Sequence, residues 1–166
     1  MILNRRIRTK LTKLLPPGAK VEAAVALQTD LPTGSPHRPE FTRSCLSLPY
    51  CRSRGLDFDN PRFRTDLANT ILTVTNRRVL FHKVKQSSIL PAPGDRVADE
   101  PLESVSLGWY DGDELPASRL LHLTFADGRH LVQITPRRGG TFIARPLAEP
   151  DLLVQAFGAR AFQIED

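Results

Sequence analysis

The chain has 166 residues, of which 40% are hydrophobic and 25% are charged. This length and composition are typical of one globular domain and exclude collagen-like, coiled-coil and disulfide-scaffold proteins. The formal net charge of +5 comes from the first 20 residues, which carry six basic side chains and no acidic one, whereas the remainder is close to neutral. No apolar run approaches the roughly 20 residues of a membrane-spanning helix.

The N-terminal segment, residues 1–17, is predicted to be a basic amphipathic helix. Apolar residues recur every three or four positions, which places them on one helical face: Leu3, Ile7, Leu11 and Leu14. The cations lie mainly on the other sides: Arg5, Arg6, Arg8, Lys10 and Lys13. Such a helix either rests on an anionic membrane surface or docks its apolar face on the protein itself or on a second copy.

A predicted first strand, residues 21–27, is followed by an irregular insertion at residues 31–66. The insertion is rich in Pro and Arg, and we expect it to be ordered and to contain one or two short strands. It holds both cysteines, Cys45 and Cys51, which we interpret as reduced thiols. The four histidines are scattered along the chain, so the sequence predicts no metal site and no cofactor.

From residue 70 onward, alternating apolar residues predict a series of antiparallel strands. Residues 70–75 and 78–84 form a hairpin around Asn76 and Arg77, and a loop is expected at residues 87–101. Further strands are predicted at residues 102–110, 121–125, 130–134 and 141–145, with a tight turn at Asp127 and Gly128. His82 and His122 fall opposite the apolar positions of their strands and are expected to be partly exposed. A helix from Pro150 to Gly158 precedes a tail, residues 159–166.

Three motifs in this order resemble bacterial pleckstrin-homology-like (PH-like) and GRAM-like domains. They are ILTVTNRRVLF (residues 71–81), PLESVS (residues 101–106) and LTFADG (residues 123–128). The resemblance covers roughly residues 18–158, apart from the insertion. It implies a mainly β fold, in which about seven strands form a curled sheet or partial barrel that a C-terminal helix caps. It also implies a non-enzymatic binding module for anionic lipids or protein segments.

Several cations are candidates for contact with an anionic partner. Besides those of the N-terminal helix, they lie at the first predicted hairpin and at a later glycine-containing turn: Arg77, Arg78, Lys83, Lys85, Arg137 and Arg138. We therefore expect peripheral membrane association, with a protein–protein adaptor as the alternative. The neutral remainder and the few aromatic residues argue against specific nucleic acid binding.

No familiar catalytic motif occurs, so an enzyme that uses the insertion is the last alternative. Nothing resembles a secretory signal. The sequence thus predicts a cytoplasmic protein, or one at the inner face of the membrane.

Overall fold

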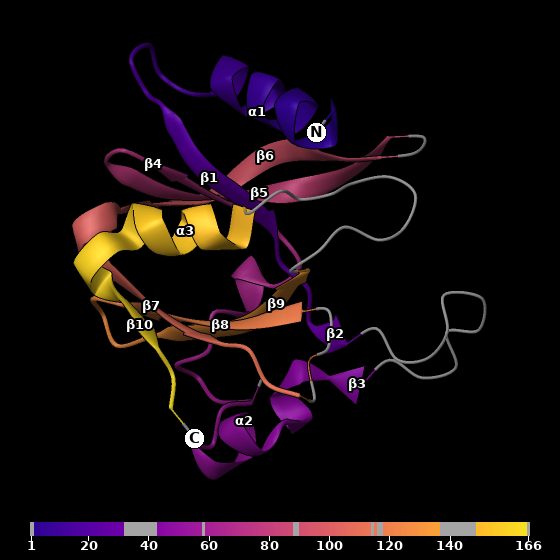
Figure 1. The fold of residues 1–166 in the computed structure, drawn as a ribbon, viewed down its shortest axis with the longest axis vertical. Coiled ribbons are helices and arrows are strands. Elements are labelled where there is room, and N and C mark those ends of the chain that lie inside the picture. Colours follow the sequence, from indigo (N-terminus) through magenta and orange to yellow (C-terminus); the bar gives the residue numbers. More distant parts are fainter. Residues whose placement is uncertain are drawn as a thin grey trace.

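The computed structural model describes residues 2–31, 43–57, 59–87, 90–113, 115, 118–136 and 149–165. In this part of the chain the fold is mainly β and is built from two four-stranded sheets in two layers (Figure 1). The first sheet is an antiparallel meander with the spatial order β1 (Val21–Ala26), β4 (Ile71–Thr75), β5 (Arg78–Ser87) and β6 (Leu90–Pro101). The second has the order β10 (Ala161–Gln163), β7 (Val105–Tyr110), β8 (Ser118–Phe125) and β9 (His130–Pro136).

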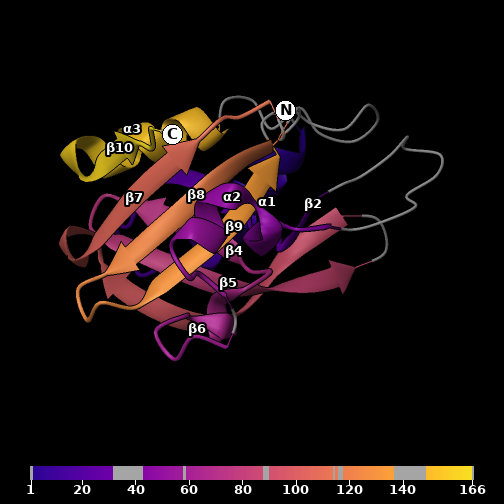
Figure 2. The ribbon, with the colours of Figure 1, turned by 90° about the horizontal axis from the view of Figure 1, so that it is seen from below.

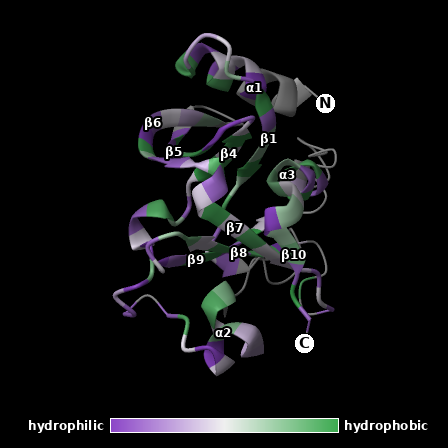
Figure 3. Ribbon diagram, turned by 90° about the vertical axis from the view of Figure 1, so that its left-hand side faces the viewer, coloured by the Kyte–Doolittle hydropathy of each residue, from purple (hydrophilic) through white to green (hydrophobic). Residues whose placement is uncertain are grey.

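The core lies between the facing sides of the two sheets. In the first sheet the register pairs Leu72 with Phe81 and Val74 with Val79, so these four side chains share the inner face. Their counterparts on β7 and β8 include Leu107, Leu121, Leu123 and Phe125. The rings of Phe81 and Phe125 meet at 6.1 Å between centroids and join the two layers. Figure 3 shows hydrophobic residues on the strands of both sheets and on α3.

The two sheets do not close into a barrel, but they are joined at one corner. Just beyond β1, Gln28 forms an isolated bridge with Ile134 of β9. Beside it, the buried Gln133 donates Nε2 to Thr29 Oγ1 at 3.1 Å and accepts the backbone N–H of Asn69 at 3.0 Å. One amide side chain therefore links β9 to the chain on both sides of the insertion.

Helix α3 (Glu149–Phe157) closes one side of the space between the sheets and packs mainly against β1 (Figure 1). Leu153 and Phe157 point into the core because they lie on one face of the helix. Gly158 ends the helix with a φ of 56°, the left-handed conformation that favours glycine at a helix C-terminus. The chain then forms β10, which pairs in parallel with β7.

Each sheet also has a covered outer face. Helix α1 (Ile2–Leu14) lies over the first sheet, next to β1 and β6 (Figures 1 and 3). The insertion covers the second sheet with β2 (Asp30–Leu31), β3 (Arg43–Ser44) and α2 (Pro49–Ser53), and Figure 2 shows α2 in front of β8 and β9. Short 3-10 turns complete the described chain at Cys45–Ser47, Thr65–Leu67, Leu102–Ser104 and Gly158–Arg160.

The structure corrects three expectations about secondary structure. Most of residues 87–101, predicted as a loop, belongs to β6, and prolines are tolerated there because β6 is an edge strand. Residues 102–104 form a 3-10 turn, so that strand begins at Val105. The segment predicted as a tail contains β10, and with β6 and β10 the two main sheets have eight strands where about seven were expected. The strand predicted at residues 141–145 lies outside the described residues.

Candidate functional site

Helix α1 is docked on the first sheet. Leu11 is fully buried, and the Arg8 guanidinium donates to the carbonyl oxygens of Val21 and Glu22 at 2.8 and 2.9 Å. Leu14, in contrast, is 53% exposed. The apolar face that the sequence offers to a membrane is therefore partly occupied by the protein's own sheet.

The predicted cations do not gather at one place. Lys13 is exposed and Lys10 is half-buried on α1, whereas Lys83 and Lys85 are exposed on β5. At about 3.3 Å per residue, Lys83 lies roughly 20 Å along the strand from Arg77. Arg5 and Arg6 lie on α1 with side chains outside the described part of the structure, and Arg137 and Arg138 lie outside it entirely.

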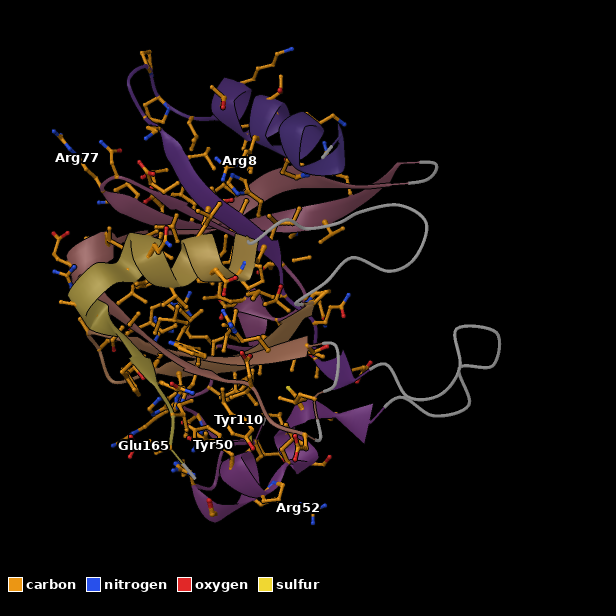
Figure 4. All side chains as sticks on the ribbon, viewed as in Figure 1. Arg8, Tyr50, Arg52, Arg77, Tyr110 and Glu165 are labelled. Atoms are coloured by element: carbon orange, nitrogen blue, oxygen red, sulfur yellow. The ribbon has the colours of Figure 1, made fainter. Side chains whose placement is uncertain are left out.

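The two arginines at the β4–β5 turn differ in their surroundings. Arg78 donates Nε to Asp99 at 2.6 Å, and Arg96 approaches the same carboxylate at 3.3 Å. Arg77 is exposed, and its guanidinium has no ion-pair or hydrogen-bond partner among the described residues. Figure 4 shows it projecting from the turn at the edge of the molecule. Of this pair, Arg77 is the cation available to a partner.

A groove of about 330 Å³ opens beside this turn. Its walls come from β1, the end of β4, the residue after β6, and α3: Glu22, Thr75, Asn76, Leu102, Leu152, Gln155 and Ala156. The turn is held in place because Thr75 Oγ1 accepts the backbone N–H groups of Arg77 and Arg78 at 3.3 and 2.9 Å. Leu102 donates its N–H to the Arg77 carbonyl at 2.9 Å, which fixes the groove wall to the same turn.

The chemistry of this groove suits binding. Its lining combines two amides, one carboxylate, one hydroxyl and three apolar side chains, and holds no histidine or cysteine. The carboxylate of Glu22 forms an ion pair with Lys20, with 3.3 Å between Oε1 and Nζ. A groove of this size, with polar and apolar side chains in its wall, is large enough for part of a small molecule or a peptide.

A second polar cluster lies beneath the insertion. Tyr50 Oη is 2.7 Å from Nδ1 of His122, and Nε2 of His122 is 3.2 Å from Nδ1 of His130. Burial, with smaller contributions from His130 and Arg54, lowers the pKa of His122 to about 4, so its ring is neutral near pH 7. The three side chains form a continuous hydrogen-bonded chain from α2 to β9.

This cluster was not predicted from the sequence. Tyr50 and His122 are 72 residues apart, and only the folding of the insertion onto the second sheet brings them together. The expected partial exposure is correct for His122 but wrong for His82, which is 2% exposed. His82 does lie on the outer face of its sheet, opposite Ile71, and that face is covered by α1.

A buried arginine fixes α3 to the second sheet. Arg119 donates to both oxygens of Asp111 at 2.9 and 2.8 Å and to Asp151 of α3 at 2.9 Å. Its guanidinium also lies 4.5 Å from the centroid of the Trp109 ring. The positive charge of Arg119 is thus paired with two carboxylates of the protein itself, so we interpret this cluster as structural.

The two cysteines are free and buried in the insertion. Burial raises the pKa of Cys45 to about 12 and that of Cys51 to about 11. Both thiols are therefore protonated at neutral pH, and Cys45 Sγ lies 3.7 Å from the carbonyl oxygen of Val132 on β9. They contribute to packing here, since the thiolate is the reactive form.

Comparisons with known proteins do not place the chain in a family. Protein-family models, curated proteins and solved structures gave no significant match.

Within the described residues, no helix is long and apolar enough to cross a membrane. The same part of the chain contains no group of three or more His, Cys, Asp or Glu residues placed to hold a metal ion.

Proposed function

We propose that the protein is a non-enzymatic binding module of PH-like architecture. A four-stranded meander, a three-stranded meander and a following helix, in this chain order, support that architecture. Two of the motifs that carry the resemblance coincide with the β4–β5 and β8–β9 hairpins, and the third with the turn that leads into β7. The fully paired Arg119 and the protonated cysteines support a role without catalysis.

The groove beside the β4–β5 turn is the proposed binding site, and its ligand is a protein segment with an acidic side chain. The observation that carries this proposal is the exposed and unpaired Arg77 next to a groove with apolar and amide walls. Apolar side chains of the bound segment would pack against Leu102 and Leu152. The amides of Asn76 and Gln155 would form hydrogen bonds with its backbone, and Arg77 would form an ion pair with its acidic side chain.

Peripheral membrane association is the second candidate. It is favoured by the last turn of α1, where the exposed Leu14 follows the exposed Lys13. One short amphipathic contact gives only weak membrane affinity, and the burial of Leu11 reduces it further.

An array of peptides that differ only in their number of acidic residues tests the first candidate. We expect binding to increase with acidic content and to fall at least tenfold in Arg77→Glu. Arg52→Glu is the matched control, because it makes the same charge change at an exposed position on α2, at the opposite end of the molecule (Figure 4). An equal loss in both variants, or no preference for acidic peptides, would contradict the proposed site.

Co-sedimentation with vesicles separates the two candidates. We expect the full chain to stay in solution with both neutral and phosphatidylserine-containing vesicles. Salt-sensitive sedimentation with the anionic vesicles alone would instead support membrane association through α1.

A further inference from the structure

His122 and His130 lie on adjacent strands and on the same face of the second sheet. The β8–β9 register pairs His122 with Val132 and Thr124 with His130, which makes the two histidines diagonal neighbours. Their ring centroids are 5.3 Å apart, and His122 Nε2 and His130 Nδ1 face each other at 3.2 Å. In the metal-free protein one proton lies between these two nitrogen atoms.

The spacing of the two nitrogens matches that of ligands around a tetrahedral metal ion. With metal–nitrogen bonds of about 2.0–2.1 Å, two imidazole nitrogens on one zinc ion are about 3.3–3.4 Å apart. We propose that His122 and His130 form a two-histidine site for a divalent transition-metal ion, of which Zn²⁺ is the natural probe. The metal ion takes the place of the shared proton, which moves by exchange with water to the outer nitrogen of the ring that carried it, so both rings stay neutral and water completes the coordination.

Tyr50 prepares His122 for this role. When Nε2 of His122 binds the metal, its Nδ1 keeps the ring proton and donates it to Tyr50 Oη, which is 2.7 Å away. A hydrogen bond from the second ring nitrogen fixes the tautomer and the orientation of a metal-bound histidine.

The surroundings limit the affinity of the site. The Arg54 guanidinium lies 3.9 Å from the centroid of the Tyr50 ring, and its positive charge opposes a second cation nearby. No third His, Cys, Asp or Glu joins the two histidines within the described residues. We therefore expect weaker binding than at a zinc site with three or four protein ligands.

Isothermal titration of Zn²⁺ into the full chain tests this inference. We expect one ion per chain, with affinity reduced at least tenfold in His122→Asn and in His130→Asn. Tyr50→Phe leaves both ligands and removes the acceptor of Nδ1–H, so we expect a loss of about tenfold. Circular dichroism and thermal unfolding of each variant without metal establish that the fold is kept.

Nuclear magnetic resonance of the imidazole nitrogens provides a readout that does not depend on variants. Zn²⁺ is expected to shift the His122 and His130 signals and to leave the buried His82 unchanged. Absence of heat and of shifts, or binding that both asparagine variants retain, would overturn the proposal. The site is independent of the groove beside Arg77, so either proposal can fail without the other.

Discussion

The outer faces of the two sheets are both covered by other parts of the chain, but in different ways. The insertion buries several apolar side chains over the second sheet, including Leu48, Leu56, Cys45 and Cys51. It is also hydrogen-bonded to that sheet, through Tyr50 and through the backbone bonds that residues 62 and 64 make with His130. The insertion is thus an integral layer of the fold.

The cover of the first sheet, judged from residues 8–14 of α1, whose side chains the structure describes, makes fewer buried contacts. Among the described side chains of α1, Leu11 is the one that is fully buried. Beneath the helix, the buried atoms Thr73 Oγ1 and His82 Nδ1 have no hydrogen-bond partner among the described residues, whereas Arg64 Nη1 of the insertion, which also lacks a hydrogen bond there, lies 3.6 Å from Glu100 in an ion pair. Burying a polar atom without a partner costs about 1–3 kcal/mol. The comparison indicates that α1 is the cover that separates more easily from its sheet.

The largest expected effect is that of Leu48→Ala in the insertion. Leu48 is 2% exposed and lies among the buried side chains of the insertion over the second sheet, so the truncation removes packing and leaves a cavity. We expect the free energy of unfolding in urea to fall by about 2–5 kcal/mol, with the transition remaining a single step. A loss below about 1 kcal/mol would show that the insertion is not an integral layer.

Acidification is expected to destabilise the protein through both covers. Burial lowers the pKa of His122 to about 4 and also lowers that of His82, so the unfolded chain binds protons first, below about pH 6.5. Stability is therefore complete above pH 6.5 and decreases as the pH falls toward 4, by a total on the order of 3 kcal/mol for His122. Urea unfolding at several pH values with a chelator present measures this, and His122→Gln should flatten the profile.

Leu11→Ala is expected to have a smaller and more local effect than Leu48→Ala. The helix can leave the sheet while the core stays folded, so we expect a loss of about 1–2 kcal/mol. Hydrogen exchange should become faster in α1 while β4 and β8 stay protected. Equal losses of stability in the two Leu→Ala variants would remove the distinction between the covers.

The smallest expected effects on stability come from one substitution under each cover, and they have opposite signs. Thr73→Val removes a buried hydroxyl that has no hydrogen-bond partner in the described part of the chain, and we expect it to stabilise the protein by about 1 kcal/mol. Tyr50→Phe removes a hydrogen bond to His122 and should destabilise the protein by a similar amount. The melting temperatures of the two variants give the signs directly, and a destabilised Thr73→Val would mean that the hydroxyl is satisfied.

The local structure was largely predictable from the sequence, whereas the contacts across the fold were not. Alternating apolar residues around Asn76 and around Gly128 were sufficient to predict two hairpins, because hairpins depend on near neighbours. The same alternation placed His82 on an outer face but carried no information on what covers it. Pro91 and Pro93 suggested a loop, because proline is rare inside sheets. They are tolerated in β6 because it is an edge strand, and edge position depends on the whole sheet and not on the local sequence.

At the candidate site, too, local features were predictable from the sequence and contacts across the fold were not. Arg77 was identified from its place in a turn, but the groove beside it needs α3, which lies more than 70 residues further along the chain. The pairing of Arg78 with Asp99, which distinguishes it from its neighbour, depends on the β5–β6 register. Neither local periodicity nor charge counting contains these relations.

The corner where Gln133 joins the sheets has a consequence for how the protein folds. Thr29 and Gln133 are 104 residues apart in sequence, so a ribosome making about 5–20 residues per second completes the second partner about 5–20 s after the first. Until then, the end of β1 has neither its bridge to β9 nor the Gln133 amide. Pairing over such distances also slows refolding in solution. The residues just beyond β1 are thus among the first made and among the last to complete their hydrogen bonds.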